Sequence, residues 1–360
     1  MSIAVVGMDF REGPSTIRAQ LKAIDDSIDS PTARLRETGL LDGVVRVESC
    51  SRVEWVLSAA QPGWSAELLR GTFLKRLKEN GLGRRMHVKL AGGALHYLMR
   101  MTLGLESVAE GEHAIGRQVL KAFEGAHGAG STDRDLHLCW HALGRLLQTR
   151  KETGVGSSVG VQSLVVNELS PLPRTAPVLL LGRGEIGRQV EAALQRAGFQ
   201  NVSAFPRAEL PTFFRRATEA AAVVVATGGP AAWLELPQRT DWPFVVDVGA
   251  PPQVRHAEGW RWLSLDALLT RRGLLLDAES LATLDALSDE AAIALREALE
   301  SAQGHHVLKA IQAEKEKFFE GDVDAVLAEL SPKEARRVAE ALRGFTHRLL
   351  EVTRRASRDA

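Results

Sequence analysis

The first third of the chain mixes two patterns of apolar and polar residues. SIAVVGM (2–8) predicts a strand and STIRAQLKAIDDSI (15–28) predicts a helix. VVRVESCSRVEWVL (44–57) predicts two strands around a polar bend, because serines interrupt two alternating runs. From about residue 94 to 127 the pattern is helical, with breaks near GLES and EGE. This part of the chain is therefore expected to be a mixed α/β domain.

The middle of the chain has the pattern of a dinucleotide-binding domain. SPLPRTAP (170–177) contains three prolines and is a plausible boundary. VLLLGRGEIGRQVEAALQRAG (178–198) predicts a strand, a glycine turn and a helix. Further apolar strands are predicted at NVSAF, AAVVVATG and PFVVDVG. Apolar runs without alternation are typical of parallel strands that are buried on both faces.

The last block, about 280–360, shows almost no strand signal. In SPKEARRVAEALRGFTHRLLEV, Ser331 is expected to cap a helix, with Pro332 at its first position and Glu334 closing a capping box. One face of that helix then collects the apolar residues Val338, Leu342, Phe345 and Leu349. We expect this face to be buried against another subunit or against earlier helices of the same chain; the pattern leaves both open.

Composition places the chain among ordinary globular proteins. It has 360 residues, which suggests two or three domains, and Lys+Arg equals Asp+Glu at 45 each, so overall charge does not decide for or against a nucleic-acid partner. The longest apolar runs are too short to span a bilayer, and the N-terminus lacks the pattern of a signal peptide. Two cysteines make neither a disulfide framework nor a metal cluster. We expect a cytoplasmic protein with reduced thiols, no membrane association and no metal.

The glycine turn predicts a nucleotide site. Gly182, Gly184 and Gly187 form G-x-G-x-x-G directly after a strand and before a helix, the context that favours pyrophosphate binding over a plain turn. Arg207 follows the second strand, where NAD sites usually have an acid, so NADPH is favoured; a solvated surface arginine is the alternative. The predicted cofactor residues are Gly182, Arg183, Gly184, Glu185, Ile186, Gly187 and Arg207.

The other candidate site is a thiol. Cys50 lies in a polar bend between Ser49 and Ser51, which suits a structural cysteine poorly, and Arg52 could stabilise a thiolate or bind a carboxylate. Cys139 lies in an apolar helical pattern and is expected in the core. A thiolate together with a nicotinamide cofactor suggests capture of an activated acyl group as a thioester, followed by reduction to an aldehyde.

These segments together resemble the glutamyl-tRNA reductase family, NADPH enzymes that begin tetrapyrrole synthesis from glutamate. ESCSRVEWV is similar to the family's Thr-Cys-Asn-Arg box, and LMRMTLGLESVAEGEHAIGRQV is similar to its Gly-Leu-Asp-Ser…Gly-Glu-Pro-Gln segment. RKETGVGSSVGVQSLVVNEL is similar to the stretch that leads into the nucleotide domain. The resemblance implies an α/β multidomain fold: a catalytic domain at 1–156, a Rossmann NADP-binding domain at 157–280 and an all-helical spine and dimerisation domain at 281–360.

The resemblance also implies roles for single residues. Cys50 would be the nucleophile, and Arg52 would hold the glutamyl group. The implied substrate-binding positions are Ser49, Ser51, Arg52, Ser107, Glu112, Ala114 and Gln118. The implied partners are tRNA(Glu) charged with glutamate, a second copy of the chain in a homodimer, and the downstream aminomutase.

Several positions depart from the family pattern. The family's active-site histidine falls on Tyr97, and the neighbouring His96 points about 100° away on a helix, so either His96 takes over or the site works without that imidazole. The asparagine of the box is Ser51, and Pro-Gln after the glutamate is His113-Ala114. Two further motifs are replaced by GMDFREGP and GAPPQV. These changes gather around the acyl pocket and suggest altered substrate recognition.

Three hypotheses follow for function. The first is an NADPH-dependent reductase of glutamyl-tRNA; the second keeps the mechanism with another acyl donor; the third is a non-catalytic regulator, which Tyr97 favours and Cys50 opposes. The segment 68–90 has seven Lys or Arg against one Glu, and Arg84 and Arg85 are among them. It could contact tRNA phosphates, and a solvated helix face explains it equally well.

Overall fold

The computed structural model contains two β-sheets joined by helices. It describes residues 2–77, 86–155, 160–229, 231–236, 244–255, 261–270, 276–318, 323 and 330–359. Residues 2–292 form one compact unit with both sheets, and residues 293–360 belong to a second unit whose described elements are helices. Among the described residues, no helix is long and apolar enough to cross a membrane.

The first sheet is antiparallel and four-stranded. Its strands are β1 (Ile3–Asp9), β2 (Gly43–Glu48), β3 (Arg52–Ser58) and β4 (His87–Leu90), in the order β2-β3-β1-β4. β2 and β3 form the predicted hairpin, with Val47 paired to Glu54 and Glu48 paired to Val53. Residues 49–51 therefore form the bend, and the sequence-based prediction of two strands around Cys50 is confirmed.

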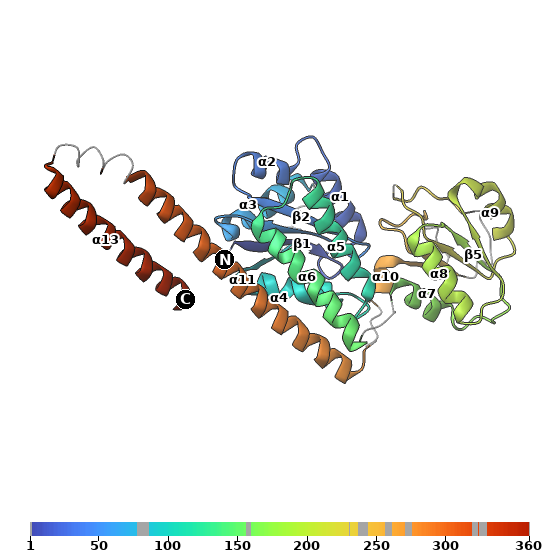
Figure 1. The fold of residues 1–360 in the computed structure, drawn as a ribbon. Helices are drawn as coiled ribbons and strands as arrows, with labels where there is room; N and C mark the ends of the chain where they lie inside the picture. The colour runs from blue at the N-terminus through green and yellow to red at the C-terminus, as the bar shows by residue number, and fades with distance from the viewer. Residues whose placement is uncertain are drawn as a thin grey trace. The chain divides into compact units, whose positions relative to one another are not determined.

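Helices cover both faces of this sheet (Figure 1). On one face, α1 (Ser15–Asp25), α2 (Pro31–Glu37) and α3 (Pro62–Arg76) bury a core in which Trp55 stacks on Phe73 with ring centroids 4.3 Å apart. The other face is covered by α4 (Ala91–Thr102), α5 (His113–Gly128) and α6 (Arg134–Thr153). Because side chains alternate along a strand, Arg52 and Glu54 point to this second face, opposite Trp55.

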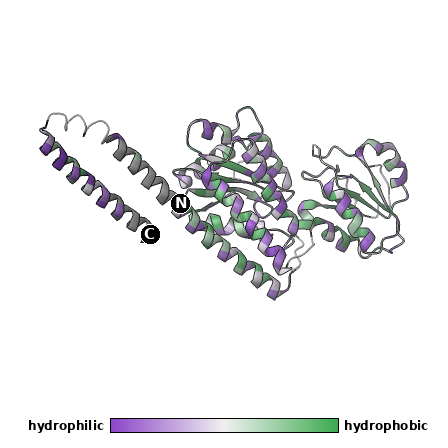
Figure 2. Cartoon of the chain, in the orientation of Figure 1, coloured by the Kyte–Doolittle hydropathy of each residue, from purple (hydrophilic) through white to green (hydrophobic). Residues whose placement is uncertain are grey.

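The second sheet is parallel and five-stranded. Its strands are β5 (Val178–Leu181), β6 (Val202–Phe205), β7 (Ala222–Val225), β8 (Val245–Asp247) and β9 (Trp262–Ser264), in the order β6-β5-β7-β8-β9. The strands β5 and β7 are completely buried, as their unbroken apolar sequence predicted, and Figure 2 shows the hydrophobic colour of these strands. The strand order reverses between β5 and β7, which is where such sheets bind ligands.

Short helices pack around the second sheet. α7 (Val161–Leu169), α8 (Glu185–Arg196) and α10 (Leu265–Thr270) contribute to one core cluster, and α9 (Leu210–Ala217) belongs to the cluster on the other face. The described part of the chain ends with two long helices, α11 (Ala278–Phe318) and α13 (Pro332–Asp359). The Ser331 backbone N–H donates to the Glu334 carboxylate, so that half of the predicted capping box is confirmed.

Candidate active site

A cavity of about 440 Å³ is lined by residues from both halves of the unit 2–292. The hairpin bend contributes Ser49 and Cys50, and α5 with its cap contributes Glu112, Ala114 and Gln118. From the nucleotide half, the lining residues include Gly184, Glu185, Ile186, Thr227, Gly228, Val248 and Gly249. The predicted nucleophile and the predicted nucleotide turn therefore face the same space.

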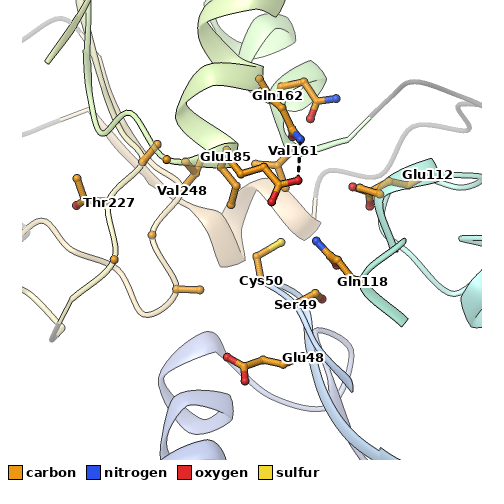
Figure 3. A pocket seen from close by; sticks show the side chains of 18 residues that line it. Glu48, Ser49, Cys50, Glu112, Gln118, Val161, Gln162, Glu185, Thr227 and Val248 are labelled. Atoms are coloured by element: carbon orange, nitrogen blue, oxygen red, sulfur yellow. Dashed lines mark hydrogen bonds between the residues drawn. The ribbon is translucent and has the colours of Figure 1, made fainter. Parts of the chain in front are cut away.

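The hairpin bend holds the Cys50 thiol in this cavity (Figure 3). The Ser49 hydroxyl accepts the Ser51 backbone N–H at 3.2 Å, which closes the bend locally. The Cys50 carbonyl accepts a hydrogen bond from the Arg18 guanidinium at 2.9 Å. Cys50 is partly buried, whereas Cys139 is completely buried in the core, as its apolar helical pattern predicted.

Burial raises the pKa of the Cys50 thiol from its ordinary 9.0 to about 11. The negative charge of Glu112 acts in the same direction, and the positive charges of Arg18 and Arg52 lower the pKa by less than these two effects raise it. Arg52 therefore acts in favour of a thiolate, but burial and Glu112 outweigh it in the protein alone. The thiol is accessible from the cavity and stays protonated until a base removes its proton.

Glu112 is the carboxylate best suited to interact with that thiol. It caps the N-terminus of α5, where burial raises its pKa to about 7, against the lowering effects of Arg52 and Arg117. A carboxylate with this pKa exchanges protons readily near neutral pH. Figure 3 shows the Gln118 side chain beside the Cys50 sulfur, so a polar amide also faces the thiol.

The three glycines of the turn differ in what surrounds them. A Cβ on Gly187 would lie 2.0 Å from the Gly182 carbonyl oxygen, and one on Gly182 would lie 2.2 Å from the Ala226 carbonyl oxygen. Both positions therefore require glycine for packing; Gly182 also has φ +117°, in the region that favours glycine. A Cβ on Gly184 would meet nothing within 4 Å, so this position is open toward the cavity.

The edge of the second sheet supports this turn. Gly184 precedes α8, whose N-terminus has a partial positive charge suited to a phosphate. Beside it, the buried Asp247 carboxylate accepts backbone N–H bonds from Gly249, Gln253 and Val254 at 2.9, 2.6 and 2.7 Å. These bonds fix the 248–250 segment of the cavity wall. Open space at Gly184, a helix N-terminus and a fixed wall fit a dinucleotide. The negative charge of Glu185, next to the turn, opposes a pyrophosphate, and Glu48 and Glu112 also line the cavity.

Arg52 lies away from the cavity lining. Its side chain is completely buried; the guanidinium contacts Glu54 Oε1 at 3.1 Å and Tyr97 Oη at 3.3 Å, and it also donates to the Glu106 carbonyl. Tyr97 in turn donates to Glu54 Oε1 at 2.8 Å. The Glu54 carboxylate and the Tyr97 phenol therefore both contact the Arg52 guanidinium. Arg52 can bind a substrate carboxylate directly only if these contacts break.

The remaining predicted substrate residues also lie outside the lining. Ser51 and Ser107 are buried, and the Ser107 backbone N–H bonds the Gly104 carbonyl. His96 points to Asp289, with Nε2 2.8 Å from the carboxylate. Neither His96 nor Tyr97 faces the thiol; both line a second cavity of about 540 Å³.

Sequence reasoning missed two residues. His87 on β4 places its ring 5.3 Å from that of Tyr97, and its Nδ1 lies 2.9 Å from Glu12, so the imidazole nearest to this network comes from an unexpected strand. Arg18 is buried on the inner face of α1, where it contacts the Cys50 carbonyl and Asp266. The sequence signal for Arg18 was a charged side chain three residues before Leu21, on the apolar face of that helix.

Arg207 lies at the carboxyl end of β6 but outside the lining. Its guanidinium stacks on the Trp233 ring, 4.0 Å from the centroid, and contacts the Gly228 carbonyl at 3.4 Å. Arg183 is exposed next to the turn. Arg84 and Arg85, in the basic segment 68–90, lie outside the described residues.

Fold and site together define a Rossmann-type α/β protein in which a cysteine of a second α/β domain faces the nucleotide turn. Comparison with known proteins agrees. Residues 6–151 match the family "Glutamyl-tRNAGlu reductase, N-terminal domain". The chain is similar to glutamyl-tRNA reductases, as a divergent relative, and the family match covers its N-terminal part.

The individual relatives have low sequence identity to this chain. A glutamyl-tRNA reductase from Alkalilimnicola ehrlichii is 29% identical over 64% of this chain and 56% of its own length. The chain spans about half the length of the first curated relatives it matches. One from Rubrobacter xylanophilus is 24% identical over 97% of this chain and 90% of its own. The solved structure of glutamyl-tRNA reductase from Methanopyrus kandleri has the same fold, with a TM-score of 0.55 and 20% identity over 99% of this chain and 97% of that one.

Proposed function

We propose that the protein is an NADPH-dependent reductase that converts glutamyl-tRNA to glutamate 1-semialdehyde, the first step of tetrapyrrole synthesis. One observation supports this most: Cys50 and the Gly184 turn line the same cavity. The thiol that forms the thioester and the nucleotide that reduces it must both reach the same carbonyl carbon. A shared cavity is the arrangement that this chemistry requires.

In this proposal Glu112 is the general base for the thiol. Its pKa of about 7 allows it to take the proton of Cys50 as the sulfur attacks the ester carbonyl of glutamyl-tRNA. The carbon–sulfur bond forms, the ester carbon–oxygen bond breaks, and the tRNA hydroxyl leaves with the proton that Glu112 received. Because the thiol pKa is about 11, this proton transfer has to accompany the attack.

Gly182, Gly184, Gly187 and the start of α8 would hold the nucleotide, and Arg207 would contact the 2′-phosphate after leaving Trp233. When bound, NADPH supplies the hydride that reduces the thioester to the aldehyde. The Cys50 sulfur would then leave as a thiolate, and it would regain a proton from water, directly or through Glu112 once that carboxylate has taken up a proton from solvent. The fixed 248–250 wall and the apolar Val248 side chain would limit the access of water to the thioester.

Substrate and partners complete the proposal. Ser49, Ala114 and Gln118 line the acyl side of the cavity, and the tRNA is the leaving group. Domains at 1–156, 157–280 and 281–360 would serve catalysis, nucleotide binding and dimerisation. Val338 and Phe345, apolar and exposed on α13, suit burial against a second copy.

The experiment is NADPH oxidation by purified protein with glutamyl-tRNA, with the aldehyde measured as product. Cys50→Ser should abolish both signals, and Cys139→Ser, the matched core cysteine, should retain them if the variant folds. Activity that persists in Cys50→Ser would refute the thioester. Absence of both signals in the wild type, with any donor, would favour a non-catalytic regulator.

A second candidate keeps the mechanism and changes the acyl donor. The observation that favours it is the closed Arg52–Glu54–Tyr97 cluster, because the described lining of the cavity then offers no arginine to the carboxylate of glutamate. A panel of aminoacyl-tRNAs and acyl thioesters separates the two candidates. A donor that supports faster NADPH oxidation than glutamyl-tRNA would favour this second function.

A further inference from the structure

Two histidines on α6 face each other at the surface, and the described lining of the active-site cavity contains no residue of this helix. His137 and His141 are one helical turn apart, and their Nε2 atoms lie 2.9 Å from each other. Their rings meet edge to face, with centroids 4.5 Å apart. His141 is exposed and His137 is partly exposed, so solutes can reach both rings.

In the protein alone, the two Nε2 atoms are hydrogen-bonded to each other. Each neutral imidazole has one N–H and one lone pair, so one Nε2 must donate to the other. Among the described residues, neither histidine forms an ion pair with a carboxylate. The two side chains are nevertheless held in place: the Trp140 ring lies 5.7 Å from His137 and 6.0 Å from His141 between centroids.

The separation of the two nitrogens matches a metal chelate. Imidazole nitrogens lie about 2.0–2.1 Å from a first-row metal ion, so two of them at 90° are about 2.8–3.0 Å apart, and at the tetrahedral angle about 3.3–3.4 Å apart. The observed 2.9 Å corresponds to the 90° angle of square-planar or octahedral coordination. Cu²⁺ and Ni²⁺ prefer this geometry and bind imidazole strongly.

We propose that His137 and His141 form a two-imidazole binding site for Cu²⁺ or Ni²⁺, with water in the remaining positions. The described residues gather no set of three or more potential ligands, so the protein supplies these two nitrogens only. The His127 ring lies tilted against that of His137, with centroids 5.1 Å apart, but its Nδ1 pairs with the Thr132 hydroxyl and it stays outside the chelate. Cys139, between the two histidines in sequence, is buried on the opposite side of the helix and contributes nothing.

The test uses the full chain, free of any affinity tag and with Cys50 replaced by serine so that the cavity thiol does not bind the metal. Cu²⁺ is added and followed by calorimetry and by electron paramagnetic resonance. We expect one tight equivalent with two nitrogen ligands. His137→Ala and His141→Ala should each weaken binding by at least about tenfold, because each removes half of the chelate.

Three controls make the outcome decisive. His141→Gln keeps a polar side chain on the same exposed turn and should lose binding while the circular dichroism of the protein is unchanged. His347→Ala, on the exposed face of α13, should bind as tightly as the parent. Equal affinity of the parent and both pair variants would overturn the site, and loss of binding in His127→Ala would overturn its two-imidazole composition.

Discussion

The ionisation of Cys50 gives the sharpest test of the site without any substrate. With a pKa of about 11, the thiol is about 0.1% ionised at pH 8, against about 10% for a cysteine at its ordinary 9.0. Alkylation requires the thiolate, so iodoacetamide should modify Cys50 about 100-fold more slowly than an unperturbed thiol at that pH. The rate should still rise about tenfold per pH unit up to about pH 10.

Replacing Glu112 should accelerate this modification. Glu112→Gln removes a negative charge that raises the pKa of Cys50, so the thiolate fraction at pH 8 increases. Below about pH 7 the carboxyl group is itself protonated, and the difference from the wild type should disappear. Glu124→Gln makes the same charge change on the exposed side of α5 and should have no effect.

The assay is mass spectrometry of the native protein after timed exposure to iodoacetamide, with Cys139 as internal reference. Burial also raises the pKa of Cys139, and its side chain is inaccessible, so only unfolding should expose it. A labelling rate for Cys50 that levels off near pH 8, or a slower rate in Glu112→Gln, would refute the electrostatic account. Slower turnover combined with faster alkylation in Glu112→Gln is what a general base predicts.

Three further predictions concern the fold and the cofactor. Gly187→Ala should lower the free energy of unfolding, measured in urea, by about 1–3 kcal/mol or more, because the new Cβ would lie 2.0 Å from a backbone oxygen. Gly184→Ala should leave the stability unchanged and weaken NADPH binding in a fluorescence titration. Tyr97→Phe should cost about 1–3 kcal/mol, because Glu54 loses a buried donor, and an unchanged midpoint would contradict that bond. Burial raises the pKa of Asp247 to about 6 from its ordinary 3.8, so the folded state holds the carboxyl proton more tightly than the unfolded state does. The free energy of unfolding should therefore fall by up to about 3 kcal/mol as pH rises from about 4 to about 6. Asp247→Asn should remove this pH dependence.

Single strands, turns and helix caps were predictable because the residue patterns that specify them span only a few neighbouring positions. The hairpin around Cys50, the strand and glycine turn at 178–187 and the cap at Ser331 all depend on neighbours within a few residues. The helical pattern at 94–127 divides into α4 and α5 around the breaks that its glycines marked. Such short-range patterns determine which elements form.

The side-chain partners were not predictable, because they come from distant segments. Arg52 meets Tyr97, 45 residues away, and Arg18 meets the Cys50 carbonyl, 32 residues away. His87 reaches the same network only because β4 pairs with β1, and no pattern in the sequence specifies that pairing. The pKa of the thiol likewise depends on distant groups, since burial and Glu112 outweigh the lowering effect of Arg52.

The most direct test of the central claim is to trap the acyl group. Protein incubated with glutamyl-tRNA in the absence of NADPH, then denatured and mapped by mass spectrometry, should contain a glutamyl adduct on Cys50 alone, and added NADPH should release it as the aldehyde. An adduct that forms equally in Cys50→Ser, or aldehyde production without any adduct at Cys50, would contradict the account.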